Sequence, residues 1–511
     1  MAEAKLESKF DHPKDGILSK LFGGRSGWKI CLAIVLALVV VGGIYGYNAF
    51  FREVPQEVCG DVEEANKASL CASDAEEKFK YGSLGSEEDR GLPYPLFHVL
   101  PRAMPDLLPG PGGYRSLGIP WEQGRELPVG FSKKVVGFPR ITQNCAVCHT
   151  STYRTSVDAT PVVVPTGPSH TSNVQGFLDF LEKAGRDPRF SADVLMPQIE
   201  QSFELSFLEK LAYRYLIIPI ARKRIVEQAE TFAWMRAHGR PDWGPGRDDP
   251  MNLTKFFMIE MEDDGTTGNA DFPSIWNMNL RENTSMNWAG ETLDPLAVFI
   301  DSALGLGAPP GEPFMEQMRE LREYLRAKQP PPFPFDIDQT LADAGKPVFA
   351  EHCGDCHSEG GTYFGGVVPI DEIGTDRERF DTWQQEHADE VNRVAKEEMG
   401  VDRKDMIKDV GYASQPLDGI WLRAPYLHNG SVPGLRDLLT EPDRRPKVFY
   451  RGCDLYDPDA MSFVSSGPSK ACPRVFMLDT RERGNGNGGH TYGIELSAAE
   501  KDALVEYMKT F

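Results

Sequence analysis

Two short cysteine–histidine motifs constrain this chain more than any other feature. They read Cys145-Ala-Val-Cys148-His149 and Cys353-Gly-Asp-Cys356-His357. Each is a C-x-x-C-H pattern, which is typical of covalent attachment of a c-type haem. The paired thiols reach the two vinyl groups of one porphyrin, and the adjacent histidine binds the iron from the proximal side. We therefore expect two covalently bound haem c groups, with His149 and His357 as iron ligands.

The alternative for these motifs is a pair of zinc knuckles, because C-x-x-C also binds zinc. A closed tetrahedral zinc site would require the two motifs, about two hundred positions apart in the chain, to pair and to leave out at least one histidine. The spacing of both complete motifs favours haem.

An apolar segment near the N-terminus predicts a membrane anchor. Ile30 to Tyr47 is an 18-residue run without a charged residue, long enough to cross a bilayer. The basic residues before it predict a cytoplasmic N-terminal arm: Lys14, Lys20, Arg25 and Lys29. The alternative is a cleaved signal peptide, but no small-x-small cleavage site follows the run. We expect a cytoplasmic arm over 1–29, a single-pass anchor over 30–48 in a bacterial inner membrane, and haem domains in the periplasm.

Charge and cysteine usage agree with that compartment. The net charge of −21 argues against a nucleic-acid partner, so we expect a redox partner protein or a small-molecule substrate. Four of the nine cysteines belong to the motifs and Cys31 lies in the apolar run. The remaining four form two local pairs, which predict disulfides in an oxidising compartment: Cys59 with Cys71, and Cys453 with Cys472.

The proline-rich segment over 329–338 predicts a domain boundary, because it stiffens the chain into an extended connector. We expect a first haem domain with extended loops and a helical insertion over 49–328, and a second cytochrome c-like domain over 339–511. Helical patterns cover Val174 to Ala184 and Val194 to His238, with a break at Pro219. The predicted fold is mainly α, with long loops and few short strands.

The second domain resembles a class I cytochrome c at both of its ends. A helix leads into the second motif, and the last segment is an amphipathic helix with a capping box of Ser497 and Glu500. In that family a glycine and an aromatic residue of the first helix pack on an aromatic residue of the last helix. The matching positions here are Gly345, Phe349 and Tyr507.

The segment from Trp421 to Leu435, which includes Ala-Pro-Tyr-Leu-His428-Asn-Gly-Ser, resembles the dihaem cytochrome c peroxidase superfamily. The resemblance is greatest to its rubber-oxygenase-like branch, over about 90–511. It implies that His428 is the second ligand of the second iron. Other candidates are His490 and four methionines: Met399, Met406, Met461 and Met477. The peroxidase family proper has a methionine where this chain has Pro442.

The same resemblance implies aromatic side chains over the distal face of the first haem, and we assign this role to Phe272 and Phe257. Trp276 and Trp288 are alternative aromatic bridges between the haems. His170 and His238 lie in contexts that favour ordinary loop histidines, so we expect an open iron position. Acidic residues between 260 and 271 would either move protons or form a solvated loop that binds calcium.

A haem with an open position binds oxygen or peroxide, whereas a haem with two protein ligands transfers electrons. We therefore expect the first haem to be the reactive centre and the second to be an electron relay. The alternatives are a dihaem cytochrome c peroxidase proper, and a non-enzymatic electron-transfer cytochrome in which both irons are six-coordinate.

Overall fold

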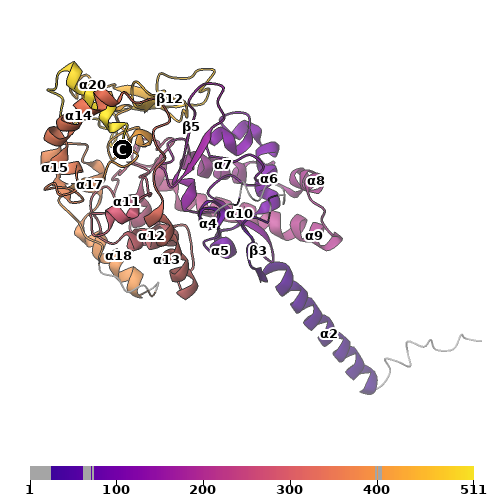
Figure 1. The fold of residues 1–511 in the computed structure, drawn as a ribbon. Coiled ribbons are helices and arrows are strands. Elements are labelled where there is room, and N and C mark those ends of the chain that lie inside the picture. Colours follow the sequence, from indigo (N-terminus) through magenta and orange to yellow (C-terminus); the bar gives the residue numbers. More distant parts are fainter. Residues whose placement is uncertain (1–24, 61, 63–70, 72–73, 398–399, 401–404) are drawn as a thin grey trace, which may run out of the picture. The chain divides into compact units, whose positions relative to one another are not determined.

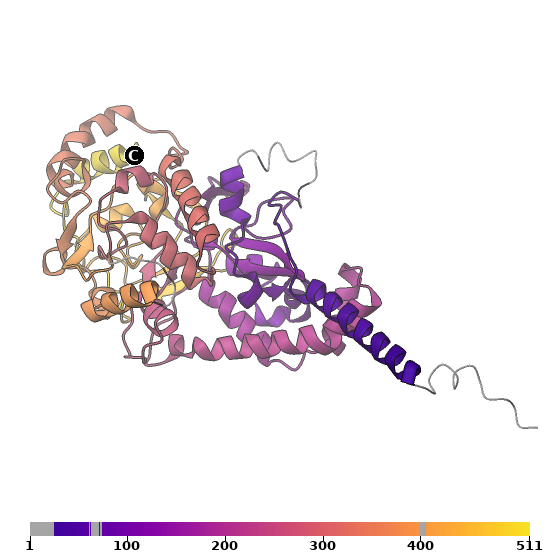
Figure 2. The ribbon, with the colours of Figure 1, turned by 90° about the horizontal axis from the view of Figure 1, so that it is seen from below.

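The computed structural model describes residues 25–511 except 61, 63–70, 72–73, 398–399 and 401–404. The chain is 44% helical and 11% strand, so the expected mainly α fold is corrected to a mixed one in which helices outweigh short strands (Figures 1 and 2). The strands are short, and most form two-stranded antiparallel pairs.

The chain forms two compact units, and the first contains residues 1–54 and 135–138. Its main element is α2 (Arg25–Phe50). Within α2, the segment Lys29–Phe50 is long and apolar enough to cross a membrane. After α2, Glu53 and Val54 of strand β1 pair antiparallel with Val136 and Val135 of β3.

The second unit contains residues 55–134 and 139–511. Its helices in chain order are α4 (Asp74–Tyr81), α5 (Glu87–Arg90), α6 (Tyr94–Ala103), α7 (Val174–Arg186), α8 (Ala192–Ser202), α9 (Phe207–Ala212), α10 (Ile218–Thr231), α11 (Pro250–Leu253), α12 (Pro295–Gly305), α13 (Glu312–Ala327), α14 (Gln339–His352), α15 (Gly354–His357), α16 (Ile370–Ile373), α17 (Glu378–Thr382), α18 (Gln385–Glu397), α19 (Leu435–Leu438) and α20 (Ala498–Met508).

The strands in chain order are β1 (Glu53–Val54), β2 (Leu92–Pro93), β3 (Phe131–Val136), β4 (Phe138–Gln143), β5 (Thr150–Tyr153), β6 (Val162–Pro165), β7 (Arg247–Asp248), β8 (Ala270–Asp271), β9 (Val367–Pro369), β10 (Gly411–Ala413), β11 (Val448–Arg451), β12 (Tyr456–Asp457), β13 (Ser462–Phe463) and β14 (Phe476–Asp479).

Helices α14 and α20 cross at a glycine, as the resemblance to class I cytochrome c implies. A Cβ atom on Gly345 would lie 1.9 Å from the carbonyl oxygen of Ala503, so only glycine permits this approach. The Phe349 and Tyr507 rings pack with centroids 5.6 Å apart. The predicted capping box of α20 is confirmed, because Ser497 and Glu500 bond reciprocally to each other's backbone N–H groups.

The helical segment predicted over 194–238 is interrupted between α8, which ends at Ser202, and α9, which begins at Phe207, and not at Pro219. At Pro219 a π-helical segment, η4 (Tyr213–Ile217), joins α9 to α10. Pro219 lies in the first turn of α10, where a proline has no intrahelical donor to lose. The wider π turn absorbs the ring, so the chain stays helical.

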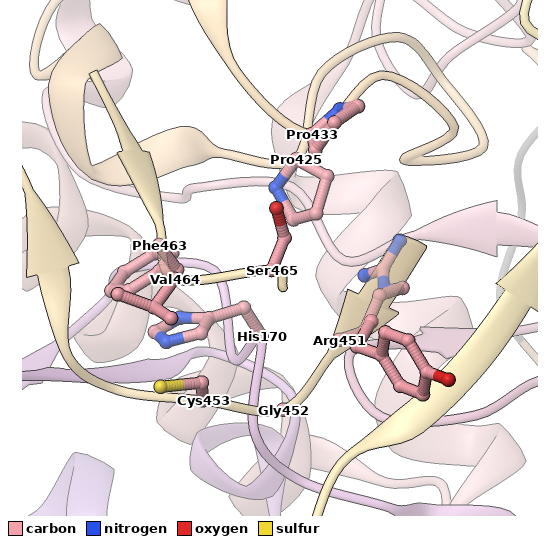
Figure 3. A pocket seen from close by; sticks show the side chains of 10 residues that line it. His170, Pro425, Pro433, Arg451, Gly452, Cys453, Phe463, Val464 and Ser465 are labelled. Carbon is pink, nitrogen blue, oxygen red and sulfur yellow. The ribbon is translucent and has the colours of Figure 1, made fainter. Parts of the chain in front are cut away.

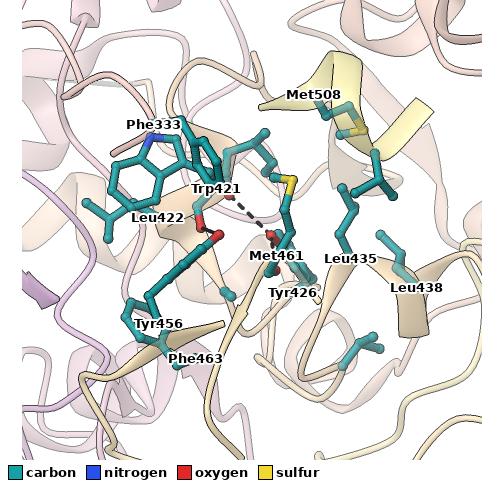
Figure 4. Packing of buried hydrophobic residues seen from close by; sticks show 14 of the residues in the cluster. Phe333, Trp421, Leu422, Tyr426, Leu435, Leu438, Tyr456, Met461, Phe463 and Met508 are labelled. Atoms are coloured by element: carbon teal, nitrogen blue, oxygen red, sulfur yellow. Dashed lines mark hydrogen bonds between the residues drawn. The ribbon is translucent and has the colours of Figure 1, made fainter. Parts of the chain in front are cut away.

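Each C-x-x-C-H motif borders its own hydrophobic core. Cys145 packs against a cluster that includes Phe299 and Phe314. Cys353 packs against a cluster around Trp421, which Figure 4 shows. Phe333, from the proline-rich segment, belongs to this second cluster, with its ring centroid 5.8 Å from that of Trp421. The division of the second unit into two haem domains at 329–338 stays a prediction.

Both predicted disulfides are present. Cys59 pairs with Cys71, with Cα atoms 6.4 Å apart, and Cys453 pairs with Cys472, with Cα atoms 5.3 Å apart. The four motif cysteines are free of disulfides and half-buried, which leaves their sulfur atoms for thioether formation.

Candidate haem centre

The first motif lies on a tight 3-10 turn, η3 (Cys145–Val147), between β4 and β5. The side chain of Asn144 caps this turn by accepting a hydrogen bond from the Ala146 N–H at 3.0 Å. His149 follows directly, and its Nδ1 lies 2.9 Å from the carbonyl oxygen of Pro273. Because a carbonyl can only accept, Nδ1 carries the proton, which leaves Nε2 free to bind a metal.

The second motif repeats this arrangement in a different backbone setting. It begins where α14 ends and continues into α15. The Nδ1 atom of His357 lies 3.0 Å from the carbonyl oxygen of Gln415, so its Nε2 is also the metal-binding atom. Burial lowers the pKa of His149 to about 4 and lowers the pKa of His357. Both rings are therefore neutral near pH 7, as metal ligation requires.

These donor sets fit haem c better than zinc. Each motif offers two free thiols and one imidazole whose outer nitrogen is already held by a backbone carbonyl. The described residues contain no group of three metal-binding side chains at either motif, whereas a structural zinc site needs four ligands.

The ring of His490 faces the ring of His357. Their centroids are 6.4 Å apart and the rings are inclined by 36°. Two metal–nitrogen bonds of about 2 Å each, with about 1 Å from each nitrogen to its ring centre, separate two imidazoles across a metal by about 6 Å. The observed spacing therefore matches a metal between these two rings.

His490 is held in place through its backbone. Its N–H donates to the carbonyl oxygen of Ile373 at 2.8 Å. The buried Arg445 guanidinium donates to three carbonyl groups of the same glycine-rich loop: Asn487, Gly489 and His490. The Nδ1 atom of His490 is buried, without a hydrogen-bond partner among the described residues. Hydrogen bonds thus hold the backbone of this loop, while the Nδ1 atom of His490 forms none with the described residues.

His428, which we expected to bind the second iron, contacts Tyr412. It stacks on Tyr412 with ring centroids 4.1 Å apart, and its Nε2 lies 3.2 Å from the Tyr412 hydroxyl oxygen. That hydroxyl also donates to the carbonyl oxygen of Asp376 at 2.9 Å, and in this arrangement it accepts from the Nε2–H of His428. His490 has no such partner among the described residues, so it becomes a second candidate beside His428, and the ligand of the second iron stays a prediction.

The methionine candidates also lie elsewhere. Met461 is fully buried in the cluster around Trp421 (Figure 4). Met406 packs in a separate cluster with Trp383, and the Met477 side chain is 55% exposed on β14. Met399 lies outside the described residues.

Around the first motif, Phe272 and Phe257 occupy different surroundings. The Phe272 ring centroid lies 6.5 Å from that of His149, and its neighbour Pro273 accepts the His149 hydrogen bond. Phe272 therefore lies close to His149, and its expected place over the distal face of the first haem stays a prediction. Phe257 packs on Phe232 with the two ring centroids 5.0 Å apart. The guanidinium carbon of Arg90 lies 4.6 Å from the Phe257 ring centroid.

The two histidine candidates for the first iron are engaged at other places. His170 stacks on Phe463 at 3.5 Å between ring centroids and its Nδ1 lies 3.1 Å from Ser151 Oγ. It lines a cavity of about 10 Å³ beside Cys453 (Figure 3), which is at the lower limit for one water molecule. The side chain of His238 is 55% exposed, with Nε2 3.5 Å from Asp263.

Trp276 links the two segments that hold the proximal histidines. It lies three residues after Pro273, the partner of His149, and is fully buried. Its indole N–H donates to the carbonyl oxygen of Asp418 at 3.1 Å, three residues after Gln415, the partner of His357. The other alternative, Trp288, instead donates to the carbonyl oxygen of Asp271 at 2.8 Å.

Arg281 reinforces this link. Its guanidinium donates to the Trp276 carbonyl oxygen at 2.9 Å and to an Asp418 carboxylate oxygen at 3.0 Å. Sequence reasoning named Trp276 only as one of two aromatic alternatives, because the bond to Asp418 joins positions 142 residues apart.

Two carboxylates of the acidic loop are already paired with cations. Asp263 forms an ion pair with Arg240, and Asp264 forms one with the buried Lys255 at 2.5 Å. The Arg240 guanidinium lowers the pKa of Asp263. A calcium ion at these two carboxylates would have to displace both cations, and calcium binding by this loop stays a prediction.

A family model described as RoxA-like, cytochrome c-like matches residues 411–450. The chain contains a RoxA-like, cytochrome c-like domain. This domain includes the carbonyl of Gln415 that holds His357, and it implies covalently bound haem c and a redox function. The structure thus ties the RoxA-like segment directly to the second C-x-x-C-H motif.

Two curated proteins of Sinorhizobium fredii are similar to the chain. One, called uncharacterized protein y4iJ, is 26% identical over 471 residues, which cover 72% of this chain and 76% of that protein. The other, called uncharacterized protein y4iM, is 27% identical over 284 residues, which cover 47% of this chain and 64% of that protein. The first of these similarities extends well beyond the RoxA-like domain.

Proposed function

We propose that the chain is a membrane-anchored periplasmic dihaem cytochrome c with an oxygen- or peroxide-reactive first haem and an electron-relay second haem. The observation that carries the proposal is the pairing of two C-x-x-C-H motifs with two different histidine environments. His357 has a second imidazole, that of His490, at 6.4 Å between ring centroids. The two histidines considered as second ligands of the first iron, His170 and His238, instead contact Ser151 and Asp263.

The second site is suited to electron transfer. His357 and His490 would hold one haem iron from its two sides, and both rings come from backbone segments fixed by hydrogen bonds. Two neutral imidazole ligands leave no position for an exogenous molecule. The half-buried setting of His490 and the Arg445 clamp on its loop keep this ligand in place.

The first site is suited to substrate chemistry. When bound, a haem with one protein ligand and a vacant position supplies the capacity to bind oxygen or peroxide and to exchange electrons. His149 orients such a group through its Nε2, and the Pro273 carbonyl keeps the proton on Nδ1. The buried ring of Phe272 would exclude water from the surroundings of His149.

Trp276 is the proposed electron bridge. Its buried indole connects the Pro273 and Asp418 segments through one hydrogen bond, so a covalent and hydrogen-bonded route between the two proximal histidines runs through it. This route favours Trp276 over Trp288 as the aromatic bridge.

Electron paramagnetic resonance of the oxidised holoprotein tests this proposal. We expect one low-spin bis-histidine signal, and a second signal that changes when cyanide or imidazole is added. Two low-spin signals that do not respond to added ligand would instead support a non-enzymatic electron-transfer cytochrome.

The second candidate is a dihaem cytochrome c peroxidase proper, the alternative within the superfamily that the chain resembles. Peroxide-dependent oxidation of a reduced cytochrome c would favour it, whereas oxygen uptake without added peroxide would favour an oxygen-reactive first haem. Activity in one of these two assays would indicate whether the chain acts with a redox partner protein or on a small-molecule substrate.

A further inference from the structure

The outer face of the helical run from α9 to α10 is apolar. Within fourteen positions, six large apolar side chains are exposed: Phe207, Leu208, Leu211, Tyr215, Leu216 and Ile220. Phe207 is 73% exposed and Tyr215 is 65% exposed. No other stretch of this length in the described second unit carries as many exposed large apolar residues. We call these six residues the α9–α10 apolar face.

These side chains are not needed for the core, because the opposite side of the same run is already packed. The buried positions recur with helical spacing: Tyr213, Ile217, Ile218, Ala221 and Ile225. Ile225 packs so closely on α7 that a Cβ atom on Gly185 would lie 2.8 Å from its Cγ2. From Tyr213 to Ala221 the run is therefore apolar on two sides, which an ordinary surface helix is not.

The second half of the run returns to the usual pattern. Its exposed positions after 222 are charged or polar, including Lys223, Arg224, Glu227 and Gln228. The inner face stays buried from Tyr213 to Ile225, so over that part only the outer face changes from apolar to polar. Figure 2 shows the run as one long helical segment, and Figure 1 places α8 and α9 on the side of the second unit away from α14 and α20.

Cations are interleaved with the apolar face. Lys210 pairs with Glu200 at 3.0 Å, and Arg214 pairs with Asp193. Both pairs are exposed, and exposed ion pairs are weak, so the two cations are available to phosphate groups. Basic residues next to apolar and aromatic side chains are the pattern of helices that lie in a membrane interface.

The chain itself supplies the reason to select a membrane. Residues 29–50 are long and apolar enough to span a bilayer, and the second unit begins at Pro55, directly after the first unit ends at Val54. A domain joined to its anchor by so few residues stays within reach of the bilayer, so even weak contacts are occupied at a high effective concentration. The acidic net charge of −21 makes a basic, apolar segment an exception on this surface.

We propose that the α9–α10 apolar face lies in the headgroup region of the phospholipid bilayer that holds α2. This proposal rests on the anchoring proposed above. It makes the haem unit a peripheral membrane body with a second point of attachment, which fixes how the unit is oriented toward lipid-soluble or membrane-bound redox partners.

Photo-crosslinking on the full-length holoprotein tests this proposal. The photoreactive residue p-benzoylphenylalanine replaces Tyr215 in one variant and Met477 in a control variant. Met477 is also apolar and 55% exposed, but lies on β14 outside the face. Each protein is reconstituted in vesicles of phosphatidylcholine with phosphatidylglycerol and irradiated. We expect roughly tenfold more lipid adduct on the peptide around 215 than on the peptide around 477.

A further variant shows whether the neighbouring side chains place Tyr215 in lipid. Phe207→Ser with Leu211→Ser, introduced together with the photoreactive residue at 215, is expected to reduce the lipid adduct several-fold. Both positions are exposed, so the haem absorption spectrum should stay unchanged. Equal lipid adduct at 215 and 477, or adducts at 215 only to a second copy of the chain, would overturn the proposal.

Extraction of the same vesicles with alkaline carbonate separates this inference from the anchoring. If the chain stays in the membrane and Tyr215 gives no lipid adduct, the apolar face is excluded while the anchor stands. If carbonate releases the chain although Tyr215 gives lipid adducts before extraction, the face is supported and the anchor is excluded.

Discussion

The imidazole rings of His357 and His490 face each other with their centroids 6.4 Å apart, although 133 positions separate them in the chain. His357 belongs to the second C-x-x-C-H motif, and His490 lies on a glycine-rich loop held by Arg445. This pair has the spacing of two imidazoles that bind one metal from opposite sides.

Replacing His490 with alanine is expected to convert the second haem from a low-spin to a high-spin, ligand-binding state, because one axial imidazole is lost. Electron paramagnetic resonance and cyanide titration measure this change. His428→Gln is the matched control. It removes the imidazole that donates to Tyr412, and the low-spin signal should persist; the reverse result would reinstate His428 as the ligand.

Replacing Trp276 with phenylalanine is expected to slow electron equilibration between the haems, because the indole N–H bond to Asp418 is lost. The lost hydrogen bond should also lower the free energy of unfolding by about 1 kcal/mol. Flash photolysis of the half-reduced, CO-bound protein measures the rate. Trp288→Phe is the control, since its indole bonds only to Asp271, and equal rates in both variants would contradict the assigned bridge.

Replacing Gly345 with alanine is expected to destabilise the contact between α14 and α20, because the new Cβ would lie 1.9 Å from the Ala503 carbonyl oxygen. Overpacking of this kind costs about 1–3 kcal/mol or more. Thermal unfolding followed by the haem Soret band measures the effect. At Gly366 a Cβ meets only ordinary contacts, the nearest at 3.5 Å; a Gly366→Ala variant should change the midpoint little, and equal losses would argue against the crossing.

Acid should destabilise the protein through His170. Burial, with a contribution from Arg451, lowers the pKa of this histidine from 6.5 to about 3. Below pH 6.5 the unfolded chain binds a proton that the folded chain does not, so the free energy of unfolding falls as the pH drops from 6.5 towards 3. By pH 5 the loss amounts to about 2 kcal/mol.

Denaturant unfolding at pH 7.5 and pH 5 measures this dependence. The His170→Gln variant should show a smaller difference between the two pH values than the wild type. Its haem spectrum should stay unchanged, because His170 stacks on Phe463 and not on an iron site. A spectral change in either haem would identify His170 as a ligand after all.

The local patterns of the chain were sufficient to predict several elements. The apolar run predicted α2, the Ser497–Glu500 pair predicted the start of α20, and leftover cysteines predicted both disulfides. Each of these signals lies within about twenty consecutive residues, where helix capping, hydropathy and short loop closure act.

The sequence by itself also determined the chemistry of the proximal side, because the two thiols and the histidine of each motif are adjacent in the chain. Only the tertiary structure brings His490 next to His357 and links the two motif segments through Trp276. His428 and His490 are equally plausible as residue types. What distinguishes the two histidines is the contact between His428 Nε2 and the Tyr412 hydroxyl, which itself donates to the carbonyl oxygen of Asp376. Hydrogen bonds between residues far apart in the chain leave no pattern in the sequence.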